Sequence, residues 1–388
     1  MIYLDHNSTT PCAPEVVALM QRFWSEEFGN PASAHLAGRK AARAVLIARK
    51  QIASLVNCNP SELVFTSGAT EGNNLIFLGL LLSKQDKRRR IVVSCIEHNS
   101  VLDSATFLAG YGFDVVYLPV TSNGVVDLDA AKMLITPETA LVSVQAANNE
   151  IGTLQPIQRI AVLAHEVGAF FHTDAAQALG KISFDLEDLG CDFASFSAHK
   201  LYGPKGIGAL FVAGGPRKWP WSHPFQGGGQ EGGLRPGTTN VPAVVGFGEA
   251  CRLGAEKLTD EMSRLSELRL AFEKRIAALI PDCTIHAQQV PRLPGTISVA
   301  FTGVPADILI DNLATICVGR GSACSDGALK SSHVLTSIGC ESNIADATIR
   351  LSLGRSTTLE QVDTTIEMLI NSVPILRDKL KGGSHVAK

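Results

Sequence analysis

The sequence has no long hydrophobic run and no paired cysteine motif, and its first residues lack the pattern of a secretory leader. The longest nearly unbroken apolar stretch, residues 75–82, is far shorter than the roughly 18 residues that a membrane-spanning helix needs. The first ten residues carry neither a basic nor an apolar segment, so we expect a cytoplasmic protein in a reducing compartment. The nine cysteines are scattered without a CxxC pair, which argues against a disulfide frame, a zinc site or an iron–sulfur cluster. We therefore expect no metal site and mostly buried thiols.

The sequence also has no excess of charge of either sign. Its 388 residues include 34 Lys and Arg against 37 Asp and Glu, a net charge of -3, which provides no basic field for nucleic acid or an anionic membrane. The basic run at residues 84–90 lacks supporting aromatics, so an exposed connection is favoured over a nucleic-acid patch. With 45% hydrophobic and 18% charged residues, the chain is suited to two or more globular domains.

Short apolar runs alternate with helical patterns between about residues 40 and 213. This alternation is typical of an α/β architecture, a mostly parallel sheet covered by helices. The seven candidate strands cover residues 63–67, 90–96, 114–120, 140–147, 169–174, 192–198 and 207–213. Beyond them, the pattern predicts a helix from Pro242 towards Ile280 that links two domains. The smaller α+β domain is predicted to contain strands at 296–301, 315–319 and 348–353, a helix around 305–313 and a C-terminal helix.

Two polar residues at predicted strand ends could carry chemistry. Lys200 follows the strand at 192–198, and its amine could form a Schiff base with an aldehyde cofactor if burial or nearby positive charge lowers its pKa. Asp174 closes the strand at 169–174, where an ionised carboxylate could hold the proton of a pyridinium nitrogen. The alternatives are a solvent-exposed lysine and an aspartate that caps a helix.

Residues 67–70 form a glycine-containing turn between a predicted strand and an apolar helical run. Their small side chains would let backbone N–H groups approach a phosphate. The turn lacks the lysine of a P-loop, which disfavours a nucleoside triphosphate, and alone it is an ordinary glycine turn. Residues 227–233 match G-x-G-x-x-G only formally, because no strand precedes them and no helix pattern directly follows, so we reject a dinucleotide site there.

Four further residues could meet a ligand. His98 could stack on a planar cofactor or move a proton, and Asn149 could hydrogen-bond a ring hydroxyl or a substrate carboxylate. Arg350 could bind an amino-acid carboxylate through two hydrogen bonds, and Cys324, in a Gly- and Ser-rich run, could bring a thiolate to a substrate. Taken singly, each has a structural alternative: a satisfied histidine, turn chemistry, a salt bridge and an inert thiol.

An ordered set of motifs runs through nearly the whole chain. The set is YLDHNSTTP, FGNPAS, FTSGATEGNN, EHNSVLD, NNEIG, HTDAAQALGK, SFSAHKLYGPKGIGAL, GGGQEGGLRPGT, GSACS and IRLSLGR. In these motifs the sequence resembles the group I cysteine desulfurases, which are fold-type I pyridoxal-phosphate enzymes. The resemblance implies a large domain over residues 14–255 with a seven-stranded, mostly parallel sheet. A small domain is then expected from residues 1–13 together with residues 256–388.

The resemblance also implies chemical roles. Lys200 would bind pyridoxal 5'-phosphate as a Schiff base and take the α-proton of L-cysteine. Cys324 would be the nucleophile that takes the sulfur as a persulfide while alanine is formed. Arg350 would hold the substrate carboxylate, with Asn149 beside it. His98 would stack on the cofactor ring and count among the catalytic residues.

The remaining cofactor contacts follow from the same resemblance. Asp174 would hold the pyridinium nitrogen and Gln177 the ring oxygen. In a homodimer, Thr238 would reach the phosphate from the partner subunit. The residues expected to bind the phosphate within one chain are Ala69, Thr70, Ser197 and His199.

The resemblance leaves the sulfur acceptor open. Members of the family feed iron–sulfur assembly, tRNA thiolation or sulfur modification of DNA, so an acceptor protein is expected as a partner, without direct nucleic-acid or membrane binding. The chain departs from many relatives in its NSTT and GRGSAC segments, which also leaves the identity of the acceptor open. The alternatives are a selenocysteine lyase or a small aminotransferase, which would not need Cys324, and a cofactor-binding scaffold without turnover.

Overall fold

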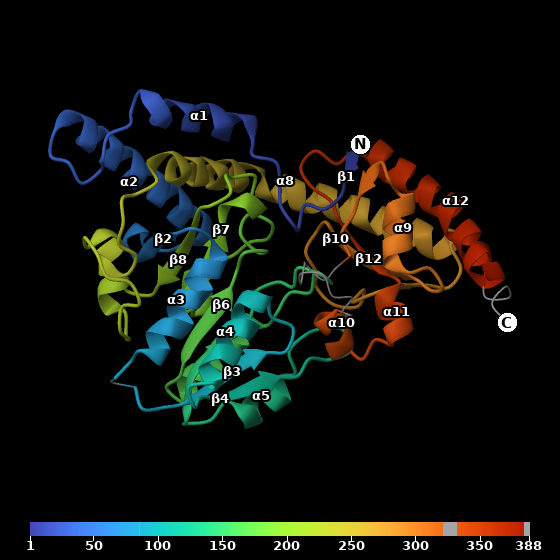
Figure 1. The fold of residues 1–388 in the computed structure, drawn as a ribbon, viewed down its shortest axis with the longest axis horizontal. Helices are drawn as coiled ribbons and strands as arrows, with labels where there is room; N and C mark the ends of the chain where they lie inside the picture. Colours follow the sequence, from blue (N-terminus) through green and yellow to red (C-terminus); the bar gives the residue numbers. More distant parts are fainter. Residues whose placement is uncertain (85, 321–331, 384–388) are drawn as a thin grey trace.

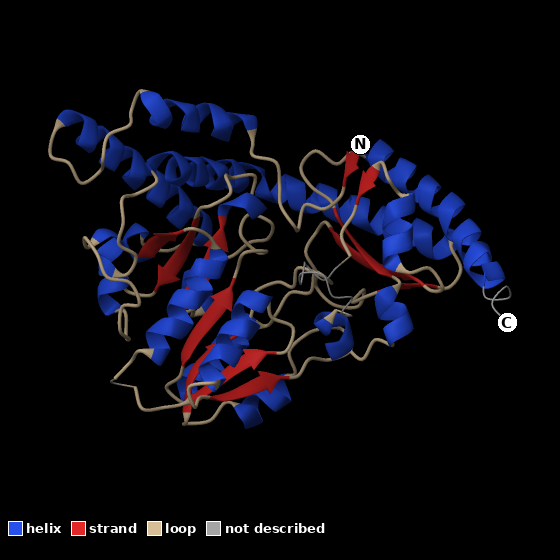
Figure 2. Cartoon of the chain, in the orientation of Figure 1, coloured by secondary structure: helices blue, strands red, loops and turns tan. Residues whose placement is uncertain are grey.

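The structure, a computed structural model, describes residues 1–84, 86–320 and 332–383. It has two parts, one built on a large sheet and one on a small sheet, and a long helix runs through both (Figures 1 and 2). None of the helices in these residues is both long and apolar enough to cross a bilayer. Cys324 lies outside the described residues.

The first part contains the predicted seven-stranded, mostly parallel sheet, with the strand order β2-β8-β7-β6-β5-β3-β4. Only β8 runs antiparallel to its neighbours. All seven predicted strands are confirmed. Their bounds are β2 (Leu63–Thr66), β3 (Arg90–Ser94), β4 (Asp114–Leu118), β5 (Thr139–Ser143), β6 (Phe170–Asp174), β7 (Phe193–Ser197) and β8 (Gly208–Val212).

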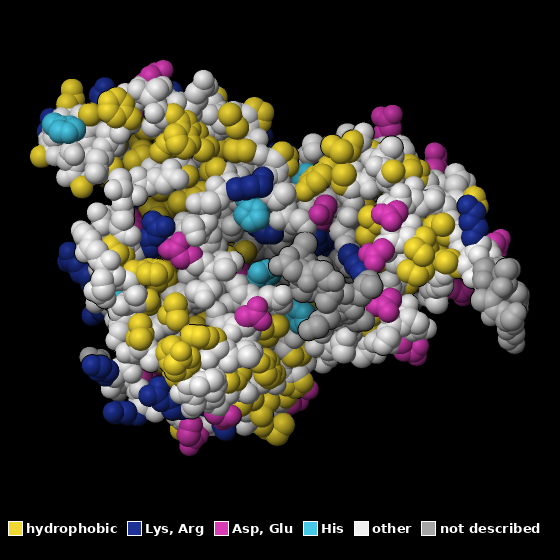
Figure 3. Space-filling model, in the orientation of Figure 1, with side chains coloured by type: hydrophobic (Ala, Val, Ile, Leu, Met, Phe, Trp, Pro, Cys, Tyr) yellow, Lys and Arg dark blue, Asp and Glu magenta, His cyan; other side chains and the backbone are white. Residues whose placement is uncertain are grey.

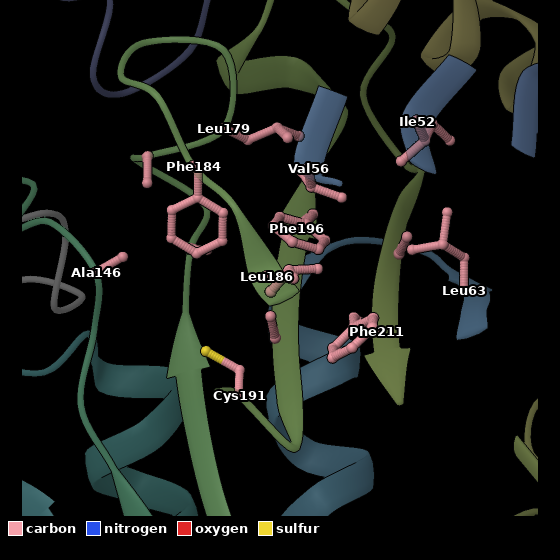
Figure 4. Close-up of a cluster of buried hydrophobic side chains, with 14 of the residues drawn as sticks. Ile52, Val56, Leu63, Ala146, Leu179, Phe184, Leu186, Cys191, Phe196 and Phe211 are labelled. Atoms are coloured by element: carbon pink, nitrogen blue, oxygen red, sulfur yellow. The ribbon is translucent and has the colours of Figure 1, made fainter. Parts of the chain in front are cut away.

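Helices cover both faces of this sheet, because its strands are apolar on both sides. Successive residues of a strand belong to different hydrophobic clusters: Val92 lies in one, and Ile91 and Val93 lie in the other. Figure 4 shows the first cluster, in which Phe196 and Phe211 lie among side chains from neighbouring helices and loops. The helices are α1 (Pro14–Ser25), α2 (Leu36–Val56), α3 (Ala69–Leu81), α4 (Asn99–Ala109), α5 (Leu128–Leu134), α6 (Ile157–Glu166) and α7 (Leu186–Leu189).

The second part contains a three-stranded antiparallel sheet in the order β12-β10-β9 and a short parallel pair, β1 with β11. The strands are β1 (Ile2–Tyr3), β9 (Cys283–Ile285), β10 (Thr296–Phe301), β11 (Ile316–Cys317) and β12 (Thr348–Ser352). The helices are α9 (Ala306–Asn312), α10 (His333–Ser337), α11 (Ser342–Asp346) and α12 (Leu359–Gly383). The sequence did not predict β1 and β9, because runs of two or three residues carry too little pattern. The strand predicted at 315–319 was too long, because only Ile316–Cys317 pairs with β1.

A single helix, α8 (Val241–Leu279), joins the two parts, as the sequence predicted. Its beginning packs in the first core through Phe247 and Cys251, and its end packs in the second core through Phe272 and Ile276. Leu4 also belongs to the second core, so the chain starts there before it enters the large sheet. The division at residues 13/14 and 255/256 stays a prediction, and its second boundary falls inside α8.

Candidate active site

A cavity of about 590 Å³ lies at the carboxyl end of the large sheet, where it meets the second part. Side chains converge there because the carboxyl ends of parallel strands share one edge of a sheet. Figure 3 shows Lys, Arg and His side chains where the two parts meet. Of the residues predicted from the sequence, those that line the cavity are Ala69, Thr70, His98, Asn149, Asp174, Gln177, Ser197, His199, Lys200 and Arg350. Thr238 does not line the cavity of its own chain.

Lys200 ends a short 3-10 turn that directly follows β7. Its amine donates hydrogen bonds to the backbone carbonyls of Asn7, at 2.6 Å, and Ser8, at 2.7 Å. Burial and the positive charge of Arg350 lower the pKa of Lys200 from 10.5 to about 8. A larger fraction of this amine is therefore neutral near pH 7 than of an ordinary lysine, and only the neutral amine is a nucleophile.

Asp174 is the last residue of β6 and is buried. One carboxylate oxygen accepts a hydrogen bond from the side-chain amide of Asn73 at 2.8 Å, and the other accepts from the backbone N–H of Ala176 at 3.0 Å. These two donors fix the position and orientation of the carboxylate at the cavity. An ionised carboxylate at a strand end can hold a positively charged nitrogen of a ligand.

One end of the cavity is suited to an anion. The helix α3 starts there at Ala69, and the first backbone N–H groups of an α-helix have no carbonyl partner within the helix. Ser197 ends β7 beside it, and the ring of His199 is hydrogen-bonded to the hydroxyl of Thr9 at 3.0 Å. Burial and the charges of Lys200 and other lysines lower the pKa of His199 to about 4, so the ring is neutral at pH 7. A neutral imidazole still offers one N–H to a phosphate.

Arg350 lies on β12 and reaches the cavity from the second part. Its guanidinium donates to Asp5 Oδ1 at 2.6 Å, to Ser8 Oγ at 2.7 Å and to the backbone carbonyl of Asn149 at 3.0 Å. Its Nε is buried and has no hydrogen-bond partner among the described residues. The side chain is thus fixed by its neighbours and keeps a free donor, which is suited to a carboxylate ligand.

His98 and Asn149 come from loops that follow strands of the large sheet. His98 caps α4: its Nδ1 accepts a hydrogen bond from the backbone N–H of Ser100 at 3.1 Å. The ring is otherwise exposed at the cavity, where it is free to stack on a planar ligand. Asn149 lies next to Arg350, whose guanidinium donates a hydrogen bond to the backbone carbonyl of Asn149.

Sequence reasoning missed the contribution of the N-terminal segment, residues 5–9. Asp5 pairs with Arg350, the carbonyls of Asn7 and Ser8 accept from Lys200, and Thr9 contacts His199. The segment was recognised only as a family motif. The available signal was its run of polar residues directly after the apolar Ile2 and Leu4, a pattern that places polar groups beside a core. Two further residues that reasoning missed are Asn73 and Lys205, which also lines the cavity.

The described cysteines do not offer an alternative nucleophile in the cavity, since none of them lines it. Burial raises the pKa of seven of these thiols, which keeps them protonated and unreactive. They are Cys12, Cys58, Cys95, Cys191, Cys251, Cys283 and Cys340. The eighth, Cys317, lies on β11.

Cys324 lies in a segment outside the described residues, and the described residues on either side of that segment lie close to the site. Gly319 exchanges two backbone hydrogen bonds with Arg350, at 2.9 and 2.7 Å. Ser332 donates to the carboxylate of Glu150 at 2.5 Å, next to Asn149. Within the described ranges, no three His, Cys, Asp or Glu side chains are grouped as metal ligands, and the expected absence of a metal stays a prediction.

Comparisons with known proteins show the family of the chain. The aminotransferase class-V family matches residues 2–365. The chain is 42% identical to the cysteine desulfurase IscS of Methylococcus capsulatus over 97% of this chain and 93% of that one, and 40% identical to IscS of Dictyoglomus turgidum over 97% and 95%. The solved structure of a NifS-like protein superposes with a TM-score of 0.89 at 36% identity and covers 97% of this chain and 100% of its own. The chain therefore belongs to the aminotransferase class-V family and, within it, to the cysteine desulfurases, which are pyridoxal-phosphate-dependent enzymes.

Proposed function

We propose that the chain binds pyridoxal phosphate in the described cavity and converts L-cysteine to L-alanine, with the sulfur transferred to Cys324 as a persulfide. The observation that carries this proposal is the pairing, in one cavity, of a lysine amine of lowered pKa with a buried, hydrogen-bonded carboxylate. An aldehyde cofactor with a ring nitrogen needs both groups.

The residues present fit the cofactor. The amine of Lys200 would hold the aldehyde carbon, and the carboxylate of Asp174 would keep a proton on the ring nitrogen. Gln177 would donate to the ring oxygen, and His98 would stack on the ring. When bound, the cofactor supplies an electron sink that stabilises negative charge at the substrate's α-carbon. The phosphate would be held by the helix N-terminus at Ala69 and Thr70 together with Ser197 and His199.

Each protein group then has a defined task. Arg350 would bind and orient the substrate carboxylate, so that the α-hydrogen lies near the Lys200 amine. Once released from the cofactor, this amine would take the α-proton, because its lowered pKa leaves it partly neutral at pH 7. The thiolate of Cys324 would attack the sulfur of the substrate. The S–S bond forms as the C–S bond breaks, and the electron pair of that bond stays with the three-carbon product, which takes up one proton at the β-carbon, regains one at the α-carbon and leaves as alanine.

A homodimer completes the proposed phosphate site. Thr238 is exposed and does not line its own cavity. Its loop is tied to the start of α3 by an ion pair between Arg235 and Glu71 at 2.9 Å. Hydrophobic side chains gather over α1 and α2, where Trp24 and Phe28 are 66% and 73% exposed (Figure 3). Such an apolar surface supports a second copy as its partner, with Thr238 of each chain reaching the phosphate of the other.

The proposed sulfur acceptor is a protein rather than a nucleic acid. Two of the five basic side chains in the run at residues 84–90 are engaged within the chain. Arg88 bonds to Asp86 and to the carbonyl of Thr139, and Arg90 pairs with Asp114 at 2.7 Å. The other three basic side chains of the run, Lys84, Lys87 and Arg89, are exposed but form only one short cluster, which is too small a basic surface for a phosphate backbone.

The proposal is tested by incubating the cofactor-loaded protein with L-cysteine and a thiol reductant. Alanine and sulfide are expected in equal amounts and over many turnovers. Without the reductant, about one sulfur per chain is expected on the protein. Cofactor binding without alanine would contradict the proposal and support a scaffold instead.

The pH dependence of cofactor attachment follows from the pKa of Lys200. The protonated amine does not attack an aldehyde, so the attachment rate rises as the amine loses its proton. Because burial and Arg350 lower this pKa to about 8, the rate is expected to rise with pH and to level off a little above pH 8. Stopped-flow absorbance after mixing cofactor-free protein with pyridoxal phosphate measures this rate. A rate that keeps rising towards pH 10, as for an exposed lysine, would contradict the lowered pKa.

Replacing Arg350 by lysine is expected to weaken substrate binding more than turnover. A lysine keeps a positive charge but cannot give a carboxylate two parallel hydrogen bonds. The loss of a hydrogen bond to a charged group costs about 1.5–3 kcal/mol, so KM for L-cysteine is expected to rise roughly 10-fold to 100-fold. Steady-state alanine formation measures both constants. A lowered kcat with an unchanged KM would show that Arg350 does not bind the carboxylate.

A further inference from the structure

We propose that Lys181 is a positioning residue that fixes the carboxamide of Gln177 and, through it, the binding of the cofactor. Lys181 has no part in the proposed chemistry and does not line the main cavity. Its amine is nevertheless hydrogen-bonded to Gln177, which does line this cavity. The inference rests on the proposed function, because it concerns how the chain holds pyridoxal phosphate.

The hydrogen bonds around Lys181 form a connected network. Its amine donates to Gln177 Oε1 at 2.6 Å and to Asn7 Oδ1 at 3.0 Å. Gln177 Nε2 in turn donates to the carbonyl of Asn7 at 2.9 Å, and the same carbonyl accepts from Lys200 at 2.6 Å. The network therefore links Lys181 to Asn7 both directly and through Gln177, and the carbonyl of Asn7 in turn binds the lysine that would carry the cofactor.

This network decides which way the Gln177 amide points. An amide group can be turned by half a rotation at little steric cost, and only its hydrogen-bond partners distinguish the two orientations. The backbone carbonyl of Asn7 only accepts, so the amide atom that faces it must be the nitrogen, and the oxygen Oε1 then accepts from the Lys181 amine. The nitrogen Nε2 is then left to bond to Asn7 and to present its second N–H to the cavity, where the ring oxygen of the cofactor is expected.

The local backbone holds Lys181 in this place. Gly180 has a φ of +66°, a conformation that L-residues with side chains rarely adopt, and a Cβ there would lie 2.0 Å from Leu201 Cδ1. The glycine therefore lets the turn pack directly against the residue that follows Lys200. Burial and the charges of Lys200 and Arg350 lower the pKa of Lys181 well below its ordinary value. Its two acceptors, Gln177 Oε1 and Asn7 Oδ1, hold the amine in place.

A double-mutant cycle on cofactor affinity tests the inference. Cofactor-free wild type, Lys181→Met, Gln177→Ala and the double variant are titrated with pyridoxal phosphate, and the apparent dissociation constants are compared. Each single variant is expected to bind about 10-fold more weakly, the effect of losing one hydrogen bond. The double variant is expected to bind no more weakly than the weaker single variant, within about twofold, because both changes remove the same contact.

Matched measurements separate positioning from a general loss of structure. Thr296→Val removes one of the two hydrogen bonds that Asn7 Nδ2 donates, the one to Thr296 Oγ1 at 2.9 Å, without touching Gln177, and is expected to change the affinity less than about twofold. Thermal unfolding of each cofactor-free variant reports its folding. If Lys181→Met does not fold, Lys181→Gln enters the same cycle, because its shorter amide cannot span both acceptors.

Three kinds of outcome overturn the inference. An unchanged affinity of Lys181→Met, or single effects that multiply in the double variant, would show that Lys181 does not act through Gln177. A loss of affinity in Thr296→Val equal to that in Lys181→Met would point to general packing. A wild type that binds no pyridoxal phosphate would overturn the proposed function itself, and this result is distinct from the other two.

Discussion

Replacing Lys200 by alanine is expected to abolish covalent attachment of pyridoxal phosphate and to reduce alanine formation by about 10³-fold or more. The variant loses both the amine that would hold the aldehyde and the base that would take the α-proton, and a positioned base alone contributes about 10²–10⁴-fold. Visible absorbance of the reconstituted protein and alanine release from L-cysteine measure the two effects.

Lys205 provides the matched control for this variant, because it lines the same cavity but neither holds the cofactor nor moves a proton in the proposed function. Lys205→Ala is expected to keep the covalently attached cofactor. If Lys200→Ala still trapped the cofactor after reduction, or if Lys205→Ala lost it, the assignment of the attachment site would be wrong.

The second large effect is expected from Cys324→Ser. This variant should bind the cofactor like the wild type, because the proposed cofactor contacts come from other residues. It should form no persulfide, and sulfur release should fall by at least about 100-fold, because a serine hydroxyl is a far weaker nucleophile towards sulfur than a thiolate. Labelling of persulfides after incubation with L-cysteine, followed by mass spectrometry, measures the loss.

A second cysteine variant controls for a general effect of losing a thiol. Cys317→Ser changes a cysteine on β11, outside the cavity, and is expected to retain the persulfide label. Full sulfur transfer by Cys324→Ser would contradict the nucleophile assignment and favour an enzyme that releases sulfur without a protein persulfide.

The sequence predicted the large sheet and the residues at its edge, and the reason is physical. Strands buried on both faces are continuous apolar runs, and a polar residue where such a run stops stands out. Asp174 and Lys200 were found in this way, and both line the cavity. In a parallel sheet, the ends of separate strands meet, so finding the strands also brought these residues together.

The N-terminal segment could not be placed in the same way. It is held by β1, a strand of two residues that pairs with β11 more than 300 residues later in the chain. Asn7 and Ser8 contact Lys200 through backbone carbonyls, and every residue type has such a carbonyl. The orientation of the Gln177 amide escaped prediction for a similar reason, because it depends on Lys181 across a turn and on Asn7 from a distant segment.

The central claim is that the amine of Lys200 holds the cofactor in the cavity between the two parts of the molecule. Reducing the cofactor-loaded protein with borohydride, digesting it and sequencing the labelled peptide by mass spectrometry tests this claim directly. The account predicts one pyridoxyl group per chain, on the peptide that contains Lys200. A label on Lys181, Lys205 or any other lysine, or a protein that carries no label, would contradict it.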